Sequence, residues 1–199
     1  MSNIDLVSEW RAARAAFTPE HRQALLDLGV PASLIILFPL VGAVRIATTS
    51  DTYQPAEDGE LAFVTPVRVD PDDAPIDRLY HPSPDAITRG GEIVDMVAWN
   101  PVHPDRWALR IGAATSLGHA DSCSERPAPV RRSPLSWLQG GALGIVPLTR
   151  DHLDVQIILL SLYSIQAEDA AHGREIRAIL RRPSSIPPIF IPSAGATAP

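Results

Sequence analysis

Residues 92–111, EIVDMVAWNPVHPDRWALRI, decide the fold of this chain. Two segments of this stretch, Glu92–Trp99 and Arg106–Ile111, are rich in β-branched and aromatic residues, which strands favour. Asparagine, proline and aspartate dominate the residues between them, 100–105, and these residue types favour turns. The stretch therefore predicts two neighbouring strands joined by a tight polar loop.

Segments on both sides of this stretch have the same character. Leu34–Phe38, Val41–Thr48 and Leu61–Val69 are apolar, rich in β-branched residues and bounded by proline or glycine, so each predicts a strand. The polar residues 54–60 between the last two favour an antiparallel pair. Gly144–Leu148 predicts one more short strand.

The beginning of the chain has helical periodicity. Apolar residues in the segment 5–28 recur at helical spacing. Thr18 and Pro19 divide this segment into two helices, because threonine caps a helix and proline suits its first position. We therefore predict two consecutive helices here.

Helical patterns return in the second half of the chain. Ser133, followed by proline, predicts a short helix that ends at Gly140. A longer helical pattern covers residues 151–182 with a break near Ser164, and Ala113–Leu117 predicts a short helix of its own.

These elements predict a single α+β domain over residues 1–182. A mixed or mainly antiparallel central sheet would come from the middle of the chain, with N- and C-terminal helices packed on it. Residues 183–199 contain prolines and no charged residue, so we expect an extended proline-rich C-terminal arm.

The basic residues exclude several functions. The chain of 199 residues contains 17 basic residues, and every one is an arginine. Walker A and protein-kinase sites need a lysine on the nucleotide phosphates, and pyridoxal-phosphate chemistry needs an amine nucleophile. The sequence therefore excludes these mechanisms within this chain, and we predict no cofactor.

Charge and cysteine content limit the partners and the compartment. The formal net charge of −6 argues against a strong general affinity for nucleic acid, although a local arginine patch is compatible with it. Cys123, the single cysteine, cannot form an intramolecular disulfide, which favours the cytoplasm. Charged residues near the start argue against a signal peptide, and Val30–Val44 is shorter than the ~20 residues of a spanning helix. We expect no membrane segment.

Arginines and a polar loop form the candidate binding surface. Strand alternation places Arg106 and Arg110 on one face, and Arg131 and Arg132 follow in the sequence as a basic cluster. Together with Asn100 on the adjoining loop, they predict a surface for phosphate or carboxylate groups. The alternative is structural: the tryptophans pack in the core and the arginines are solvated on the sheet surface.

Two residues of the same loop are the alternative catalytic candidates. His103 and Asp105 are residue types that act as general acid or base, so they allow a small hydrolase or transferase for an anionic substrate. His119 and Cys123 carry metal-ligating atoms, but no paired spacing supports a zinc site, so we predict no metal.

Several segments together resemble a known protein family. They are residues 93–99, 104–112, 117–118, 133–138, 144–146 and 167–172. They are similar to an uncharacterised family of proteobacterial genomes and of their prophage-like or plasmid-like regions. The family has no assigned activity, so the resemblance implies no catalytic residue. It does imply a role beside the replication or defence functions of mobile elements.

Our leading hypothesis is a non-enzymatic accessory or binding protein. It would contact nucleic acid or a protein partner through the arginine surface. The alternatives are the hydrolase or transferase described above, and a structural assembly subunit in which the tryptophans and the tail make protein contacts. The oligomeric state is left open by the sequence.

Overall fold

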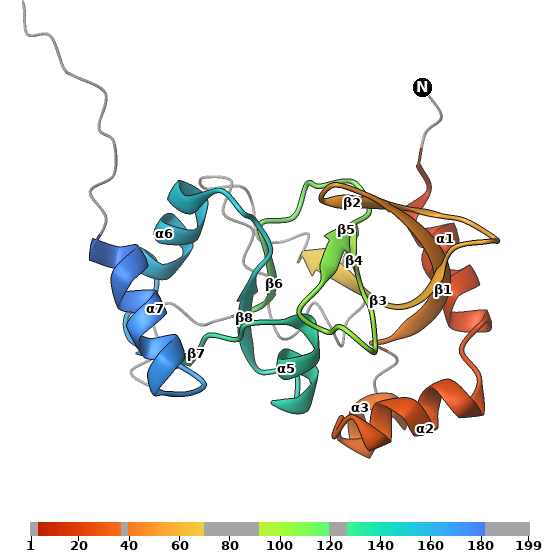
Figure 1. Ribbon diagram of the computed structural model, residues 1–199, viewed down its shortest axis with the longest axis horizontal. Helices are drawn as coiled ribbons and strands as arrows, with labels where there is room; N and C mark the ends of the chain where they lie inside the picture. Colours follow the sequence, from red (N-terminus) through yellow and green to blue (C-terminus); the bar gives the residue numbers. More distant parts are fainter. Residues whose placement is uncertain (1–3, 37–39, 70–91, 120–126, 182–199) are drawn as a thin grey trace, which may run out of the picture.

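The computed structural model describes residues 4–36, 40–69, 92–119 and 127–181 (Figure 1). Helices and strands share the chain, so the predicted α+β class is confirmed. The arm predicted over 183–199 and the cysteine Cys123 lie outside the described residues. Within the described ranges, no helix combines the length and the apolar character that crossing a membrane requires.

The elements follow one another as a helical start, a strand-rich middle and a mixed end. The helices are α1 (Leu6–Ala15), α2 (Pro19–Asp27), α3 (Ala32–Ile36), α5 (Pro134–Gln139), α6 (His152–Leu160) and α7 (Ala170–Arg181). The strands are β1 (Gly42–Thr49), β2 (Thr52–Pro55), β3 (Glu60–Val69), β4 (Glu92–Trp99), β5 (Trp107–Leu109), β6 (Ser116–His119), β7 (Ala128–Pro129), β8 (Gly144–Pro147) and β9 (Ile165–Gln166).

Five strands close into a small barrel in the order β1-β2-β5-β4-β3 (Figure 1). The predicted antiparallel pairs are confirmed, both for β1 with β3 and for β4 with β5. β2 and β5 instead meet in parallel, through the pair Thr52↔Leu109. The sheet is therefore mixed and mainly antiparallel, and its closure pairs the edges that an open sheet would expose.

Strand alternation divides the barrel into an inner and an outer apolar cluster. On β3, Ala62 and Val64 belong to the inner cluster, whereas Phe63 between them belongs to the outer one. Phe63 packs against Trp99 of β4, with ring centroids 5.1 Å apart. Both faces of the barrel wall are thus buried over this stretch.

Helix α1 covers the end of the barrel at which β1 begins. Trp10 of this helix joins the inner cluster. The backbone of Ala13 lies so close to Gly42 that a Cβ atom there would meet it at 2.9 Å. The Arg14 guanidinium also donates a hydrogen bond to the Val41 carbonyl. These contacts fix α1 against the start of β1.

The outer face of the barrel packs on α2, α3 and α5. The Thr18 hydroxyl accepts a hydrogen bond from the His21 amide at the start of α2. The Ser133 hydroxyl caps α5 in the same way. Both predicted capping signals are therefore confirmed, and the capped helices cover the aromatic outer face of β3 and β4.

The C-terminal part forms a third apolar cluster beside the barrel. β6 pairs with β8 in antiparallel orientation, and β7 pairs with β9 in parallel. Ile145 of β8 packs with Ile158 of α6 and Ile176 of α7 in this cluster. The two C-terminal helices lie at the far side of the molecule from α1 (Figure 1).

Two predicted elements are wrong. The strand predicted at Leu34–Phe38 is a helix over its described part, α3, in which the neighbouring residues Leu34 and Ile35 are both buried. The helix predicted at Ala113–Leu117 does not form, because the amide of Ala113 donates to the Asp95 carboxylate, far away in the sequence. Ser116 then begins strand β6.

Candidate functional site

A polar groove lies at the mouth of the barrel, at the opposite end of the strands from α1. Its volume is about 810 Å³. We call it the barrel-mouth groove. It is lined by Ile46, Ala47, Thr48, Ser50, Asp58, Gly59, Glu60, Leu61, Ala62, Ala98, Trp99, Asn100, His103, Asp105, Arg106, Trp107, Ala108 and Arg150.

Small inward-facing residues help to keep the mouth hollow. Ala62, Ala98 and Ala108 come from three different strands, belong to the inner cluster and line the groove. Nearer to α1, the inner cluster contains the larger side chains of Tyr53 and Met96. The barrel is therefore hollow at its mouth, which is where small barrels bind ligands.

The loop between β4 and β5 is built by Asn100. Its Oδ1 atom accepts hydrogen bonds from the amides of Val102, at 2.7 Å, and His103, at 3.3 Å. The Arg106 amide closes the loop by donating to the His103 carbonyl at 2.9 Å. The predicted ligand-binding residue Asn100 thus uses its acceptor within the loop, and it presents the neighbouring side chains at the groove.

Charges of both signs meet in the barrel-mouth groove. The Glu60 carboxylate accepts a hydrogen bond from Asn100 Nδ2 at 3.4 Å. Arg150 forms an ion pair with Asp51. The Arg106 side chain is exposed and makes no ion pair or hydrogen bond with the described part of the chain. Of the two guanidiniums in the groove, Arg106 is the one left open to a partner.

The alternative catalytic residues His103 and Asp105 also reach the groove, and both are exposed. Among the described residues, no hydrogen bond joins their side chains, and none orients the imidazole. A general base is ordinarily held by a hydrogen-bonded neighbour. The structure therefore brings the pair together at one surface without the contacts of an acid–base pair.

Arg110 does not share a surface with Arg106. Its guanidinium is nearly buried and forms a bidentate ion pair with Glu9 of α1, at 2.7 and 2.8 Å. Hydrogen bonding to Glu9 raises the pKa of Arg110. The alternative interpretation, in which Arg110 is solvated on the sheet surface, does not describe it, because Glu9 of α1 pairs with its guanidinium.

Arg131 and Arg132 do not line the groove, and both contact other parts of the protein. The Arg131 guanidinium lies against Gly140, where a Cβ atom would meet it at 2.6 Å. Arg132 forms ion pairs with Asp169 at 2.7 Å and Glu175 at 3.2 Å, and these contacts raise its pKa.

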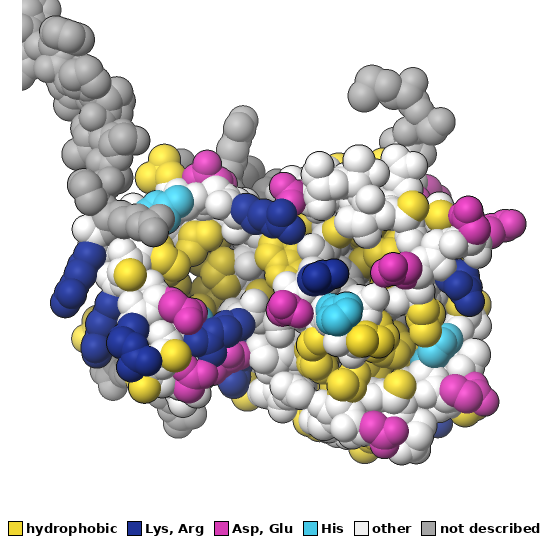
Figure 2. All heavy atoms as spheres, viewed as in Figure 1, with side chains coloured by type: hydrophobic (Ala, Val, Ile, Leu, Met, Phe, Trp, Pro, Cys, Tyr) yellow, Lys and Arg dark blue, Asp and Glu magenta, His cyan; other side chains and the backbone are white. Residues whose placement is uncertain are grey.

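The four arginines therefore do not form the single binding surface predicted from the sequence, because acids from α1 and the α7 region pair with two of the guanidiniums. On the face shown in Figure 2, acidic side chains lie close to basic ones in several places. Of the four arginines predicted to form the surface, only Arg106 lines the groove.

Asp95 is a key structural residue that the sequence patterns did not single out. This carboxylate on β4 is 0% exposed and accepts hydrogen bonds from the amides of residues 110–114. Backbone amides arranged in this way form a nest for an anion. Asp95 thereby fixes the chain where it leaves β5. A carboxylate within an otherwise apolar strand was the available signal.

The described residues contain no group of three or more His, Cys, Asp or Glu side chains placed to hold a metal ion. Comparisons with protein-family models, with curated proteins and with solved structures found no match. The interpretation of the barrel-mouth groove therefore rests on its own geometry.

Proposed function

We propose that this protein is a non-enzymatic binding protein whose barrel-mouth groove receives a segment of a protein partner that has charges of both signs and places an Asp or Glu carboxylate on Arg106. The observation that carries the proposal is the exposed Arg106 guanidinium, which makes no ion pair or hydrogen bond with the described residues. A guanidinium binds a carboxylate through two parallel hydrogen bonds. The half-buried Trp107 beside it supplies apolar surface of the kind found at the centre of interfaces.

The mixed charge of the groove supports a protein partner over a nucleic acid. Asp58, Glu60 and Asp105 line the groove together with Arg106 and Arg150. A phosphate backbone needs several uncompensated cations along its path. Three carboxylates among two guanidiniums would repel it, whereas a peptide with charges of both signs can match them.

The proposal includes a cellular compartment and a source of the partner. The reducing cytoplasm is the compartment we propose, since one cysteine cannot form an intramolecular disulfide. The family resemblance supports a search for the partner among the products of mobile elements. The unoriented pair His103 and Asp105 supports a binding role over a hydrolase.

Peptide selection tests the proposal directly, because it requires no candidate partner. Short random peptides displayed on phage are selected on the wild-type protein and counter-selected on the Arg106→Ala variant. We expect enriched peptides that carry Asp or Glu at a fixed position. Arg106→Ala should bind them at least ten-fold more weakly, because hydrogen bonds to charged groups contribute about 1.5–3 kcal/mol.

Arg177→Ala is the matched control, since it removes another exposed guanidinium from α7, outside the groove. It should leave peptide affinity unchanged. Peptides without an acidic position, or equal affinities for both variants, would refute the proposal. Labelled DNA and RNA are titrated in parallel at two salt concentrations. Steeply salt-dependent binding that Arg106→Ala abolishes would replace the protein partner by a nucleic acid.

A further inference from the structure

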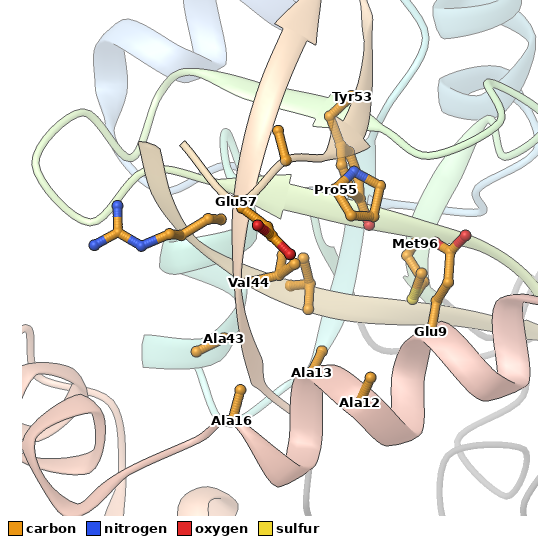
Figure 3. A pocket seen from close by; sticks show the side chains of 13 residues that line it. Glu9, Ala12, Ala13, Ala16, Ala43, Val44, Tyr53, Pro55, Glu57 and Met96 are labelled. Carbon is orange, nitrogen blue, oxygen red and sulfur yellow. The ribbon is translucent and has the colours of Figure 1, made fainter. Parts of the chain in front are cut away.

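A second pocket lies between helix α1 and strands β1 and β2 (Figure 3). Its volume is about 460 Å³, within the range of small-molecule sites. We call it the α1 pocket. Ala12, Ala13 and Ala16 form its helical wall, and Val44, Tyr53 and Met96 are among the barrel residues that line it. It shares no lining residue with the barrel-mouth groove.

Two contacts hold α1 against the barrel. Near the end of the helix, Arg14 donates to the Val41 carbonyl. One face of the helix is tied by the Glu9–Arg110 ion pair at 2.7 Å. With α1 held at these two points, its alanine side chains at the pocket are too short to fill the space between the helix and the barrel. The pocket is a consequence of this spacing.

The lining is apolar apart from Glu9 and residues of its rim. Figure 3 shows the α1 alanines facing Val44 across the pocket. The Glu9 carboxylate is already neutralised by Arg110. Arg45 and Glu57 carry opposite charges and are exposed at the rim. A charged ligand would lose its hydration in the apolar interior of the pocket, so the lining favours a neutral molecule.

Tyr53 is the polar group that this lining leaves unsatisfied. It is 1% exposed, and its hydroxyl has no hydrogen-bond partner among the described residues. Buried hydroxyl groups nearly always have a partner. Burial, followed by the charge of Glu9, raises the pKa of Tyr53, so the hydroxyl stays protonated and acts as a donor.

Met96 lines the same pocket. In Figure 3 the Tyr53 side chain passes behind Pro55 toward the side where Met96 and Glu9 lie. Methionine is unbranched and changes its rotamer easily. The Met96 side chain can therefore adapt its shape to a ligand in the pocket.

We propose that the α1 pocket binds a small neutral organic molecule with an apolar body and one oxygen that accepts a hydrogen bond from the Tyr53 hydroxyl. This site is separate from the barrel-mouth groove, and it stands whether or not the groove binds a protein. The apolar body would occupy the space beside the alanines, where burial of apolar surface supplies the affinity.

Three probes of similar shape test the proposal by amide chemical-shift titration of the full chain. Acetophenone carries the required carbonyl, ethylbenzene lacks it, and benzoate adds a negative charge. We expect acetophenone to shift the amides of α1 and β2, ethylbenzene to bind more weakly, and benzoate not to bind. Tyr53→Phe should weaken acetophenone by about two- to ten-fold, as loss of one neutral hydrogen bond predicts. It should leave ethylbenzene unchanged.

Ala12→Phe supplies an independent variant, since Ala12 is exposed at the pocket and a benzyl group there would fill it. It should abolish binding of acetophenone. Ala178→Phe makes the same change at an exposed position of α7 and should have no effect. Shifts outside the α1 pocket, or equal affinities of acetophenone and ethylbenzene in both wild type and Tyr53→Phe, would overturn the proposal. So would binding that survives Ala12→Phe.

Discussion

Replacement of Asp95 by asparagine tests how the barrel is held together. Six backbone amides donate to this buried carboxylate. Oδ1 accepts from Met96 at 2.8 Å, Arg110 at 3.0 Å and Ile111 at 3.0 Å. Oδ2 accepts from Gly112 at 3.0 Å, Ala113 at 2.7 Å and Ala114 at 3.1 Å. Asparagine has an NH2 group in place of one carboxylate oxygen. In either orientation of the side chain, the NH2 group faces three of these amides, which then have no acceptor.

The magnitude follows from the donors that lose their acceptor. A buried donor without an acceptor costs about 1–3 kcal/mol, so one such set implies at least roughly 3 kcal/mol. Water can reach the exposed residues 111–113 and keeps the cost near this lower bound. We expect Asp95→Asn to lower the free energy of unfolding by about 3 kcal/mol. The protein should still fold, since small domains have about 5–15 kcal/mol of stability.

Urea denaturation followed by tryptophan fluorescence measures this loss. At a typical slope, the midpoint should fall by about 1–2 M. The amide hydrogens of residues 110–114 should also exchange faster in the variant. Glu92→Gln makes the same chemical change at the exposed start of β4, and it should stay within about 0.5 kcal/mol of wild type. A small effect of Asp95→Asn, with unchanged exchange, would refute the reasoning.

Two further predictions concern pH and backbone conformation. Burial lowers the pKa of His172 below its ordinary value of 6.5. As the pH falls, the unfolded chain therefore takes up this proton before the folded protein does. The contribution of the neutral imidazole to stability is full above pH 6.5 and is lost below it. The unfolding free energy should therefore drop less steeply with falling pH in His172→Gln than in wild type. Gly144→Ala should destabilise the fold by several kcal/mol more than Gly141→Ala in thermal unfolding. Both glycines have a positive φ, near +87° and +80°, but a Cβ at Gly144 would lie 2.0 Å from the Pro129 carbonyl and one at Gly141 meets nothing. Equal melting temperatures of the two variants would contradict this.

Sequence patterns correctly predicted the helices and strands that end at capping or turn residues. Thr18 and Ser133 cap their helices as predicted, because a hydroxyl beside the first turn satisfies amides that the helix leaves free. The strand pair around the 100–105 loop also formed as predicted. Prediction failed where a contact with a residue distant in the sequence replaced the local hydrogen bonds. Ala113 illustrates this, since its amide turns to Asp95.

The candidate site, too, was predictable only where its residues are neighbours in the sequence. The clustering of His103, Asp105 and Arg106 was predictable, since one short loop carries all of them and strand pairing fixes its ends. The ion pairs of Arg110 and Arg132 were not predictable, because their acidic partners are distant in the sequence. Arg110 pairs with Glu9, and Arg132 pairs with acidic residues of the α7 region.

The sequence by itself determined the α+β class, the capped helices, the main strand pairs and the excluded lysine chemistry. These depend on hydrophobic period, turn residues and residue types, which act over a few neighbouring positions. Only the tertiary structure decided that the sheet closes into a barrel with a hollow mouth and that the α1 pocket exists. Only the tertiary structure left Arg106 without an ion pair among the described residues. Barrel closure, helix spacing and ion pairing bring together residues that are far apart in the sequence, and no local pattern encodes those distances.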